Sequence, residues 1–264
     1  MRTPSVIVVA NHKGGVGKTT SAVCLAHTLA DLGHATLLID CDPQNNTSQC
    51  FPTQAQAVAD DMTLCAVLKG EVPNSSAMQC VRENLYLLGS TPELSRLEKV
   101  LGAEDTHPFW LAEQLSDPLI QAGIAYVVID TPPSVNAMTV TALGAATDLF
   151  IPMRPEPFAF SGMEKLLATV ARVQKHFNPR LRLKGVFLTR YATTYRGTVF
   201  ADFTQALKEL PGLTGQLMQT TIRENVRLVE TQADTIRESI HTWAPGSNGS
   251  EDYKALTAEI LTRI

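Results

Sequence analysis

A short glycine-rich loop between a β-branched run and a helical pattern limits how this chain can fold more than any other feature. Residues 6–10 (Val-Ile-Val-Val-Ala) predict a buried strand, and residues 18–32 predict a helix that ends at Gly33. The loop that joins them, residues 11–20, reads Asn-His-Lys-Gly-Gly-Val-Gly-Lys-Thr-Thr. Glycines in such a loop let backbone N–H groups converge on phosphate oxygens, and the helix N-terminus adds positive potential. The sequence therefore predicts a phosphate-binding loop.

The rest of the chain alternates short apolar runs with longer helical patterns, which is typical of a parallel sheet with crossover helices. Further strands are predicted at 36–40, 85–88, 126–130, 149–153 and 183–188, and helices at 136–146, 161–177, 200–210 and 252–263. The strands lack polar alternation, so both faces of the sheet should be covered. We expect an α/β fold with a mostly parallel, twisted sheet and helices on both faces, in a single domain over residues 1–264. Residues 51–83 have the least regular pattern and are expected to form surface helices and loops.

Composition narrows the class of protein. Of the 264 residues, 44% are hydrophobic and 18% are charged, which excludes a disordered tail protein or a coiled coil. No apolar run reaches the ~18 residues of a membrane-spanning helix, and the N-terminal run is too short for a signal peptide. The five cysteines have no C-x-x-C spacing, which argues against a zinc or iron–sulfur site and favours reduced thiols. We expect a cytoplasmic protein with no membrane partner.

Individual loop residues have specific expected roles. Lys18 would reach the β- and γ-phosphates of a nucleotide, and the Thr19 hydroxyl would bind Mg²⁺. The common pattern of such loops has glycine five positions before Gly17, where this chain has His12, and an additional lysine, Lys13, follows. The remaining residues expected to surround the phosphates are Gly14, Gly15, Val16, Gly17 and Thr20.

Carboxylates stand at the ends of two predicted strands. Asp40 ends the strand at 36–40 and Asp42 follows it by two residues, and Asp130 ends the strand at 126–130 after four apolar residues. The carboxyl ends of parallel strands form the ligand-binding edge of a doubly wound sheet. An aspartate at one strand end is as often a turn former or helix cap. Two such sites together with the glycine loop favour a functional role, and Thr19, Asp40 and Asp130 are the candidate Mg²⁺ ligands.

The string Lys-Gly-Gly-Val-Gly-Lys-Thr-Thr at 13–20 resembles the deviant Walker A box of the ParA/MinD family of ATPases. In that family the first lysine reaches across a nucleotide-sandwich dimer to the partner's ATP, a role that the resemblance assigns to Lys13. An extra cation supplied in trans would act on the transferring phosphoryl group as an arginine finger does. The segment 40–44 (Asp-Cys-Asp-Pro-Gln) resembles switch I, in which the second acid, here Asp42, positions the attacking water. The segment 130–133 (Asp-Thr-Pro-Pro) resembles switch II.

Two later segments extend the resemblance over nearly the whole chain. Residues 155–162 resemble the segment near the family's dimer face, and residues 222–230 resemble the one beside the nucleotide base. Ile222 and Arg223 are therefore candidate base contacts. The family's common Pro-Arg pair is replaced here by Arg-Glu at 223–224. The resemblance thus implies Lys13, Lys18 and Asp42 as catalytic residues.

The branches of the family differ in features that the sequence displays. Long partition proteins carry an N-terminal DNA-reading domain, which we do not expect because the first strand begins at about Ser5. The MinD branch ends in a basic amphipathic membrane helix, whereas the charges of 252–264 cancel and predict a packed core helix. The nitrogenase iron-protein branch needs cluster cysteines, which the cysteine pattern does not suggest. The short ParA, Soj-like type fits best.

Basic residues are unevenly distributed along this acidic chain, whose net charge is −4. Residues 165–201 contain eight of the 22 lysines and arginines and no Asp or Glu. Such segregation suggests an electrostatic footprint for a polyanion, although ordinary solvated surface charge also explains it. The candidate DNA-binding residues are Lys175, Arg180, Arg182, Lys184, Arg190 and Arg196, extended by Arg223 and Arg227.

The resemblance implies an ATP-dependent partition or positioning ATPase with ATP and Mg²⁺ as cofactors. Such a protein forms a homodimer on ATP binding, binds non-specific nucleoid DNA, and hydrolyses ATP when a ParB-like or other activator stimulates it. Its cargo would be a chromosome or plasmid locus or a protein complex. Two alternatives stay open: a MinD-like membrane-surface ATPase, and an ATP-dependent biosynthetic ligase on the same scaffold, similar to dethiobiotin synthetase, which would not need Lys13.

Overall fold

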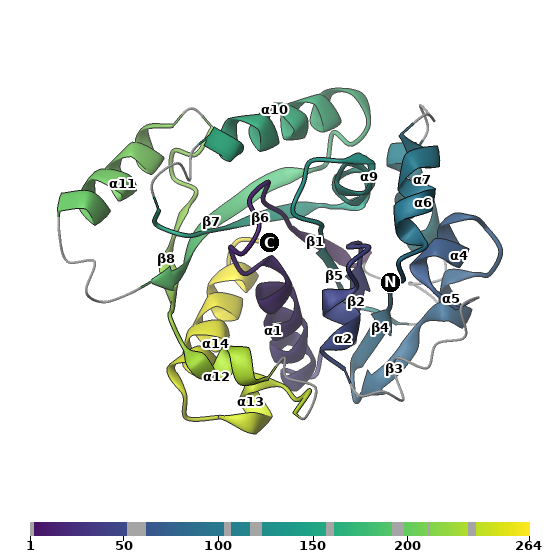
Figure 1. Ribbon diagram of the computed structural model, residues 1–264, viewed down its shortest axis with the longest axis horizontal. Coiled ribbons are helices and arrows are strands. Elements are labelled where there is room, and N and C mark those ends of the chain that lie inside the picture. Colours follow the sequence, from purple (N-terminus) through teal and green to yellow (C-terminus); the bar gives the residue numbers. More distant parts are fainter. Residues whose placement is uncertain are drawn as a thin grey trace.

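The structure is a computed structural model that describes residues 3–51, 62–102, 107–116, 123–156, 161–191, 198–210, 212–231 and 236–264. Its strands are β1 (Ser5–Val9), β2 (Thr36–Asp40), β3 (Gln79–Arg82), β4 (Leu85–Leu88), β5 (Tyr126–Asp130), β6 (Asp148–Met153), β7 (Arg182–Tyr191) and β8 (Leu217–Arg223). They form one eight-stranded sheet in the order β3-β4-β2-β5-β1-β6-β7-β8 (Figure 1). Every neighbouring pair is parallel except β3 and β4. The predicted mostly parallel sheet is confirmed, and the single-domain organisation stays a prediction.

Helices cover both faces of the sheet, as predicted. They are α1 (Lys18–Asp31), α2 (Asn46–Gln49), α4 (Leu64–Leu68), α5 (Asn74–Ala77), α6 (Leu94–Leu101), α7 (His107–Leu115), α9 (Ala137–Ala145), α10 (Ser161–His176), α11 (Thr198–Glu209), α12 (Val226–Glu230), α13 (Ile240–Trp243) and α14 (Asn248–Leu261). Figure 1 shows α1 and α14 on one side of the sheet, and α9 and α10 on the other. The sheet is the middle layer of three.

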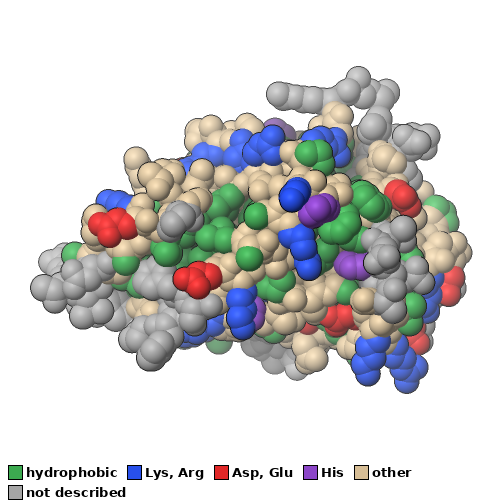
Figure 2. Space-filling model, turned by 90° about the horizontal axis from the view of Figure 1, so that it is seen from above, with side chains coloured by type: hydrophobic (Ala, Val, Ile, Leu, Met, Phe, Trp, Pro, Cys, Tyr) green, Lys and Arg blue, Asp and Glu red, His purple; other side chains and the backbone are tan. Residues whose placement is uncertain are grey.

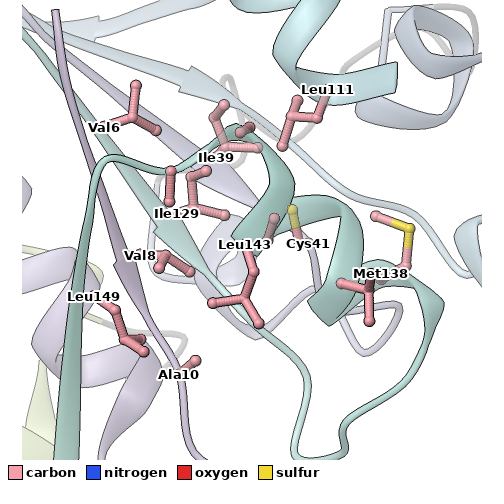
Figure 3. Close-up of a cluster of buried hydrophobic side chains, with 14 of the residues drawn as sticks. Val6, Val8, Ala10, Ile39, Cys41, Leu111, Ile129, Met138, Leu143 and Leu149 are labelled. Atoms are coloured by element: carbon pink, nitrogen blue, oxygen red, sulfur yellow. The ribbon is translucent and has the colours of Figure 1, made fainter. Parts of the chain in front are cut away.

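The side chains of β1 explain why both faces of the sheet must be covered by helices. Val6 and Val8 belong to the core cluster that contains Leu143 of α9, and Val8 lies near Leu143 (Figure 3). Ile7 and Val9 belong to the other core, which α1 and α14 close. Because successive residues of a strand point to opposite faces, an unbroken apolar strand is buried on both sides.

The strand order brings three carboxyl ends together. The central strand β1 lies between β5 and β6, and Val9 is in register with Asp130 of β5. Strand β2 lies beyond β5, and its Asp40 is also in register with Asp130. The connection from β1 to β2 therefore runs toward the β3 edge of the sheet, and the connection from β5 to β6 runs toward the β8 edge. Ligands bind at such a switch point of a parallel sheet, and the glycine loop leaves β1 there.

Two strands that the sequence did not predict, β3 and β8, are the two edges of the sheet. Edge strands are paired on one side only, and β8 exposes polar side chains between its buried Met218 and Ile222, which hides the strand pattern. The expectation of surface helices and loops at 51–83 is wrong for α4, because all five of its residues are buried in the core.

The C-terminal helix α14 is part of the core, as predicted. Its Tyr253, Leu256 and Ile260 are each 1% exposed and belong to the apolar cluster beneath α1. The apolar face that a membrane anchor would need is therefore already buried against the sheet. Over the described residues, no helix combines the length and the apolarity that crossing a bilayer requires.

Candidate functional site

The glycine loop lies between β1 and α1 and is held from several sides. Gly15 and Gly17 have φ values of +71° and +82°, in the left-handed region that favours glycine. The Thr189 hydroxyl of β7 donates to the Val16 carbonyl at 2.8 Å, and the Asn11 amide donates to the Pro152 carbonyl at 2.7 Å. The first amides of α1 have no acceptors within the helix. The loop is therefore a fixed concave surface of backbone N–H groups.

A cavity of about 440 Å³ opens above this loop. The residues that line it are Gly14, Gly15, Gly17, Lys18, Thr19, Thr20, Asp42, Asn46, Gln49, Cys50, Pro133 and Arg190. The structure thus brings together most of the predicted phosphate-loop residues and the predicted water-positioning Asp42. A cavity of this size fits a small ligand such as a nucleotide's phosphates.

Lys18 is 6% exposed, and its ammonium donates to the Lys13 carbonyl at 3.1 Å. Burial lowers the pKa of Lys18, while the charges of Asp130 and Asp42 act in the opposite direction. A buried ammonium with so few partners has lost its contacts with water, and hydrogen bonds to an anion in the cavity would compensate for that loss. The position fits a phosphate-binding lysine.

Asp130 is fully buried and contacts Thr19, which lines the cavity. The Thr19 and Thr47 hydroxyls both donate to Oδ2 of Asp130, at 2.8 and 2.7 Å. The other carboxylate oxygen, Oδ1, is buried and has no hydrogen-bond partner in the described part of the chain. Burial raises the pKa of Asp130 above its usual range. An orphaned carboxylate oxygen beside a threonine hydroxyl fits a Mg²⁺ site, because Mg²⁺ prefers oxygen ligands.

Asp40 and Asp42 differ in their surroundings. Asp40 is fully buried, and both of its oxygens accept hydrogen bonds, from the Asp42 amide at 3.0 Å and from the Ser48 amide and hydroxyl at 2.8 and 2.7 Å. Burial and the neighbouring Asp130 raise the pKa of Asp40. Asp42 lines the cavity. Asp40 and Asp130 are both fully buried, but only Asp130 of these two has a carboxylate oxygen without a hydrogen-bond partner among the described residues. A metal role for Asp40 therefore stays a prediction that the geometry supports less well than one for Asp130.

Lys13 points to a carboxylate on its own chain. Its ammonium pairs with Oε2 of Glu156 at 2.6 Å, and Arg154 pairs with Oε1 of the same residue at 2.7 Å. The hydrogen bond from Lys13 holds the pKa of Glu156 below its usual range. The sequence placed Glu156 in a segment near the dimer face but did not predict this contact.

A second cavity, of about 370 Å³, adjoins the first beside β8. Ile222 and Arg223, the predicted base contacts, both line it, although the Arg223 guanidinium is occupied by Asp252, to which it donates at 2.7 and 3.0 Å. Arg190 lines both cavities. The sequence grouped Arg190 with the DNA-binding candidates and missed this position.

Comparison with known proteins decides the family. The sequence profile of a family described as an AAA domain matches residues 4–183. The chromosome-partitioning ATPase Soj of Thermus thermophilus is 36% identical over 98% of this chain and 96% of that protein. The chromosome partitioning protein ParA of Caulobacter vibrioides is 35% identical over 98% of this chain and 94% of that protein. The chain belongs to the ParA/MinD family, in its Soj-like branch.

Similarity to a solved structure supports the same fold. Cobyrinic acid a,c-diamide synthase from Mycobacterium smegmatis, with bound ATP analog and magnesium, is 27% identical over 98% of this chain and 94% of that chain, with a TM-score of 0.81. The predicted family and fold class are therefore confirmed, and as a member of the ParA/MinD family the chain is an ATPase.

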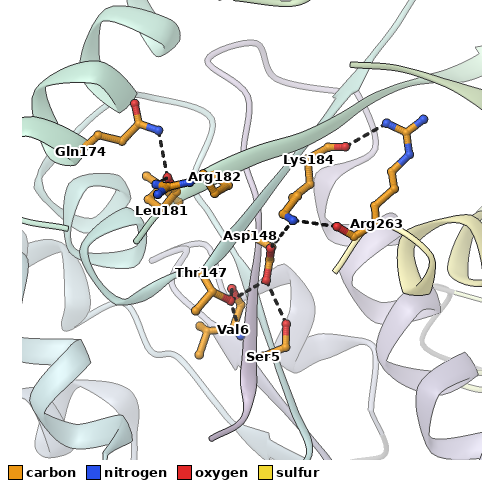
Figure 4. A network of polar contacts seen from close by, with 9 residues as sticks. All are labelled: Ser5, Val6, Thr147, Asp148, Gln174, Leu181, Arg182, Lys184 and Arg263. Carbon is orange, nitrogen blue, oxygen red and sulfur yellow. Dashed lines mark hydrogen bonds and ion pairs between the residues drawn. The ribbon is translucent and has the colours of Figure 1, made fainter. Parts of the chain in front are cut away.

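The predicted DNA-binding residues of this ParA/MinD protein do not form one group. Lys184 is half-buried in a polar network, where it lies 3.8 Å from Asp148 and donates to the Arg263 carbonyl (Figure 4). Arg182 is exposed and donates to backbone carbonyls. Arg227 pairs with Glu230 at 2.8 Å. The remaining candidates are Lys175 and Arg180, which are exposed, Arg190 and Arg223 at the cavities, and Arg196, which lies outside the described residues.

Proposed function

We propose that this chain is an ATP-dependent positioning ATPase that dimerises around two ATP molecules, binds non-specific DNA as that dimer, and hydrolyses ATP when a ParB-like partner stimulates it. ATP and Mg²⁺ are its nucleotide and metal. Partitioning of a chromosome or plasmid is the activity named for its relatives. On this proposal the protein works in the cytoplasm, associated with the nucleoid.

The position of Lys13 is the observation that carries the proposal. A lysine that served only its own nucleotide would point into its own cavity, as Lys18 does. The Lys13 side chain is instead 38% exposed and pairs with Glu156 on the surface. A cation so placed is accessible to an anion on a second subunit, where it would stabilise the charge on the transferring phosphoryl group.

The other residues at the cavity have separate roles in phosphate binding, Mg²⁺ binding and orientation of water. Lys18 and the loop amides bind the β- and γ-phosphates, and Thr19 with Asp130 holds Mg²⁺, which supplies positive charge to the phosphate oxygens when bound. Asp42 orients the attacking water. Its Oδ1 accepts a hydrogen bond from the Gln44 amide at 2.9 Å, which fixes the carboxylate at the cavity wall. In-line attack requires such fixed positioning, because phosphoryl transfer needs little covalent chemistry from the protein.

The exposed face of α10 is the surface that best fits DNA. Lys165, Arg172 and Lys175 are exposed and separated by seven and three residues, which places them along one side of the helix. Arg180 follows shortly after the helix and is also exposed. Figure 2 shows Lys and Arg side chains in several places on one face of the molecule, some of them side by side. A dimer presents the α10 face twice.

The two alternatives are less well supported. The buried apolar face of α14 leaves no amphipathic surface for a MinD-like membrane anchor. The similarity to a diamide synthase favours a ligase as the second candidate. A ligase that works within one active site has no use for a lysine directed away from its own cavity, and its turnover would rise with cobyrinic acid and not with DNA.

The test is a salt titration of DNA binding by the Asp42→Ala variant with ATP. Loss of the water-orienting carboxylate should trap an ATP-bound dimer, visible by size-exclusion chromatography. That dimer should bind DNA of any sequence, only with ATP, and more weakly at higher salt, with a log–log slope of about −0.9 per phosphate neutralised. Binding without nucleotide, or binding that is unchanged by salt, would contradict the proposal.

Charge-reversal variants test whether the basic face of α10 is the DNA-binding surface. Lys175→Glu with Arg180→Glu removes two contacts in each protomer, so the slope should flatten by about three to four. The matched control reverses Arg96 on α6 and Lys254 on α14, both exposed, and should leave the slope unchanged. Equal effects of the two pairs would show that α10 is not the DNA surface.

A further inference from the structure

Arg190, the penultimate residue of β7, lies where the two cavities of the site meet. The phosphate-loop cavity and the cavity beside β8 share three lining residues, Gly17, Thr20 and Arg190. The first cavity contains the amides of the glycine loop, and the second contains Ile222 and Arg223. A nucleotide with its terminal phosphates in the first cavity and its base in the second crosses this junction with the phosphate nearest the ribose.

The backbone of Arg190 is held in an uncommon conformation. Its φ is +49°, in the left-handed region that residues other than glycine rarely adopt. Both neighbours are fastened: the Thr189 hydroxyl donates to the Val16 carbonyl, and the Tyr191 carbonyl accepts from the Glu224 amide at 3.2 Å. Such conformations persist where the surroundings over-determine them, and they cluster at ligand sites. The segment that carries Arg190 is thus fixed to the phosphate loop on one side and to β8 on the other.

The guanidinium of Arg190 is available to a ligand, unlike that of Arg223. Asp252 accepts two-pronged hydrogen bonds from Arg223 and satisfies its charge. Among the described residues, no hydrogen bond or ion pair engages the Arg190 guanidinium, and its charge acts at a distance on Glu156. The planar fork of a guanidinium matches the oxygens of a phosphate, with which it forms paired charge-assisted hydrogen bonds.

We propose that Arg190 binds the α-phosphate of the nucleotide, and that it therefore contributes to the affinity for ATP and ADP alike. This inference rests on the proposed function in that ATP occupies the two cavities. It assigns to Arg190 a role within one protomer and separates it from the DNA-binding candidates. Lys13, by contrast, would act across the dimer and only on the nucleotide that carries a γ-phosphate.

The experiment measures the affinities of Arg190→Ala for a non-hydrolysable ATP analogue, ADP and the GTP analogue by isothermal titration calorimetry, without DNA. Loss of a charge-assisted phosphate contact should weaken all three by about tenfold or more, by the same factor. Arg190→Lys should recover part of the loss, since an ammonium keeps the charge but not the fork. Arg96→Ala on α6 is the control for removal of an exposed arginine and should bind like the parent.

Each other outcome overturns the inference in a recognisable way. A loss confined to the ATP analogue indicates a γ-phosphate contact, and a changed preference between the ATP and GTP analogues indicates a base contact. Unchanged nucleotide affinity with weaker ATP-dependent DNA binding makes Arg190 a DNA contact. In that last case Lys18→Ala, measured in parallel, decides whether the loop assignment itself holds. Circular dichroism spectra that match the parent exclude misfolding as the cause, and Arg190→Lys gives a second test if Arg190→Ala does not fold.

Discussion

Replacement of Glu156 by Gln should strengthen ATP-dependent dimerisation. The Glu156 carboxylate holds the ammonium of Lys13 at 2.6 Å and Arg154 at 2.7 Å on the surface of one protomer. If Lys13 must reach the nucleotide of a second subunit, this ion pair has to break in each protomer first. Its free energy therefore opposes dimerisation, and Gln removes the charge while it keeps the shape of the side chain.

The solvent exposure of the Lys13–Glu156 ion pair determines how much Glu156→Gln should strengthen the dimer. The two side chains are 38% and 27% exposed, so solvent screens their attraction, and pairs of this kind contribute about 0.5–1 kcal/mol. Two pairs per dimer give about 1–2 kcal/mol, which is roughly five- to thirtyfold in the dissociation constant of the dimer. The Gln amide oxygen still accepts a hydrogen bond from Lys13, so we expect a value near the lower end, about fivefold.

Sedimentation of the ATP-bound protein measures this constant, with every variant made in the Asp42→Ala background to prevent hydrolysis. Glu164→Gln, an exposed glutamate of α10, is the matched control for loss of one negative charge. The effect should vanish when Lys13 is also replaced by Ala, because the two residues then share no interaction. It should also shrink in high salt, which screens the pair. A Glu156→Gln dimer that is weaker than the parent, or a gain that persists without Lys13, would refute the reasoning.

Two further predictions concern Lys18 and His27. Lys18→Ala should weaken binding of a non-hydrolysable ATP analogue at least tenfold by calorimetry, because a buried charge-assisted contact contributes ~1.5–3 kcal/mol, and unchanged affinity would disprove the loop assignment. Burial, together with the charges of Arg82 and His241, lowers the pKa of His27 to about 3. Below pH ~6.5 the unfolded chain therefore binds a proton that the folded chain does not, and stability falls as the pH falls. Urea unfolding at pH 7.5 and 5.5 should show a loss of about 1.4 kcal/mol from this residue that His27→Gln lacks, and an equal loss in the variant would exclude His27 as the cause.

The sequence predicted those parts of the site whose place in the fold follows from the order of neighbouring elements along the chain. The glycine loop joins one strand to one helix, so its shape depends on ten consecutive residues. Asp42 and Asp130 follow apolar strands, and parallel strands place their carboxyl ends at one edge. In the structure Asp40 is in register with Asp130, and of the three carboxylates Asp42 is the one that lines the cavity. Sequence alone did not contain that register.

The residues that the sequence missed depend on contacts between distant elements. Glu156 follows β6 and meets Lys13, 143 positions earlier in the chain, only because β1 and β6 are neighbours. Arg190 lines both cavities because the end of β7 contacts the phosphate loop through Thr189 and pairs with β8 at Tyr191. A basic residue in a basic segment carries no local signal that separates a nucleotide contact from a DNA contact, and only its place in the sheet distinguishes the two.

The basic segment shows how a strand and a helix distribute charge differently. Arg182 and Arg190 belong to the same strand, β7, and at about 3.3 Å per residue they stand roughly 26 Å apart, near opposite ends of the strand. Lys184, two residues after Arg182, contacts Asp148 and the Arg263 carbonyl, which follows α14. A helix rises only about 1.5 Å per residue, so the basic residues of α10 remain within reach of a few consecutive phosphates. A charge count along the sequence therefore overstates the proposed DNA surface by every residue that lies on the strand, and the α10 face is the part of the segment whose charges can act together.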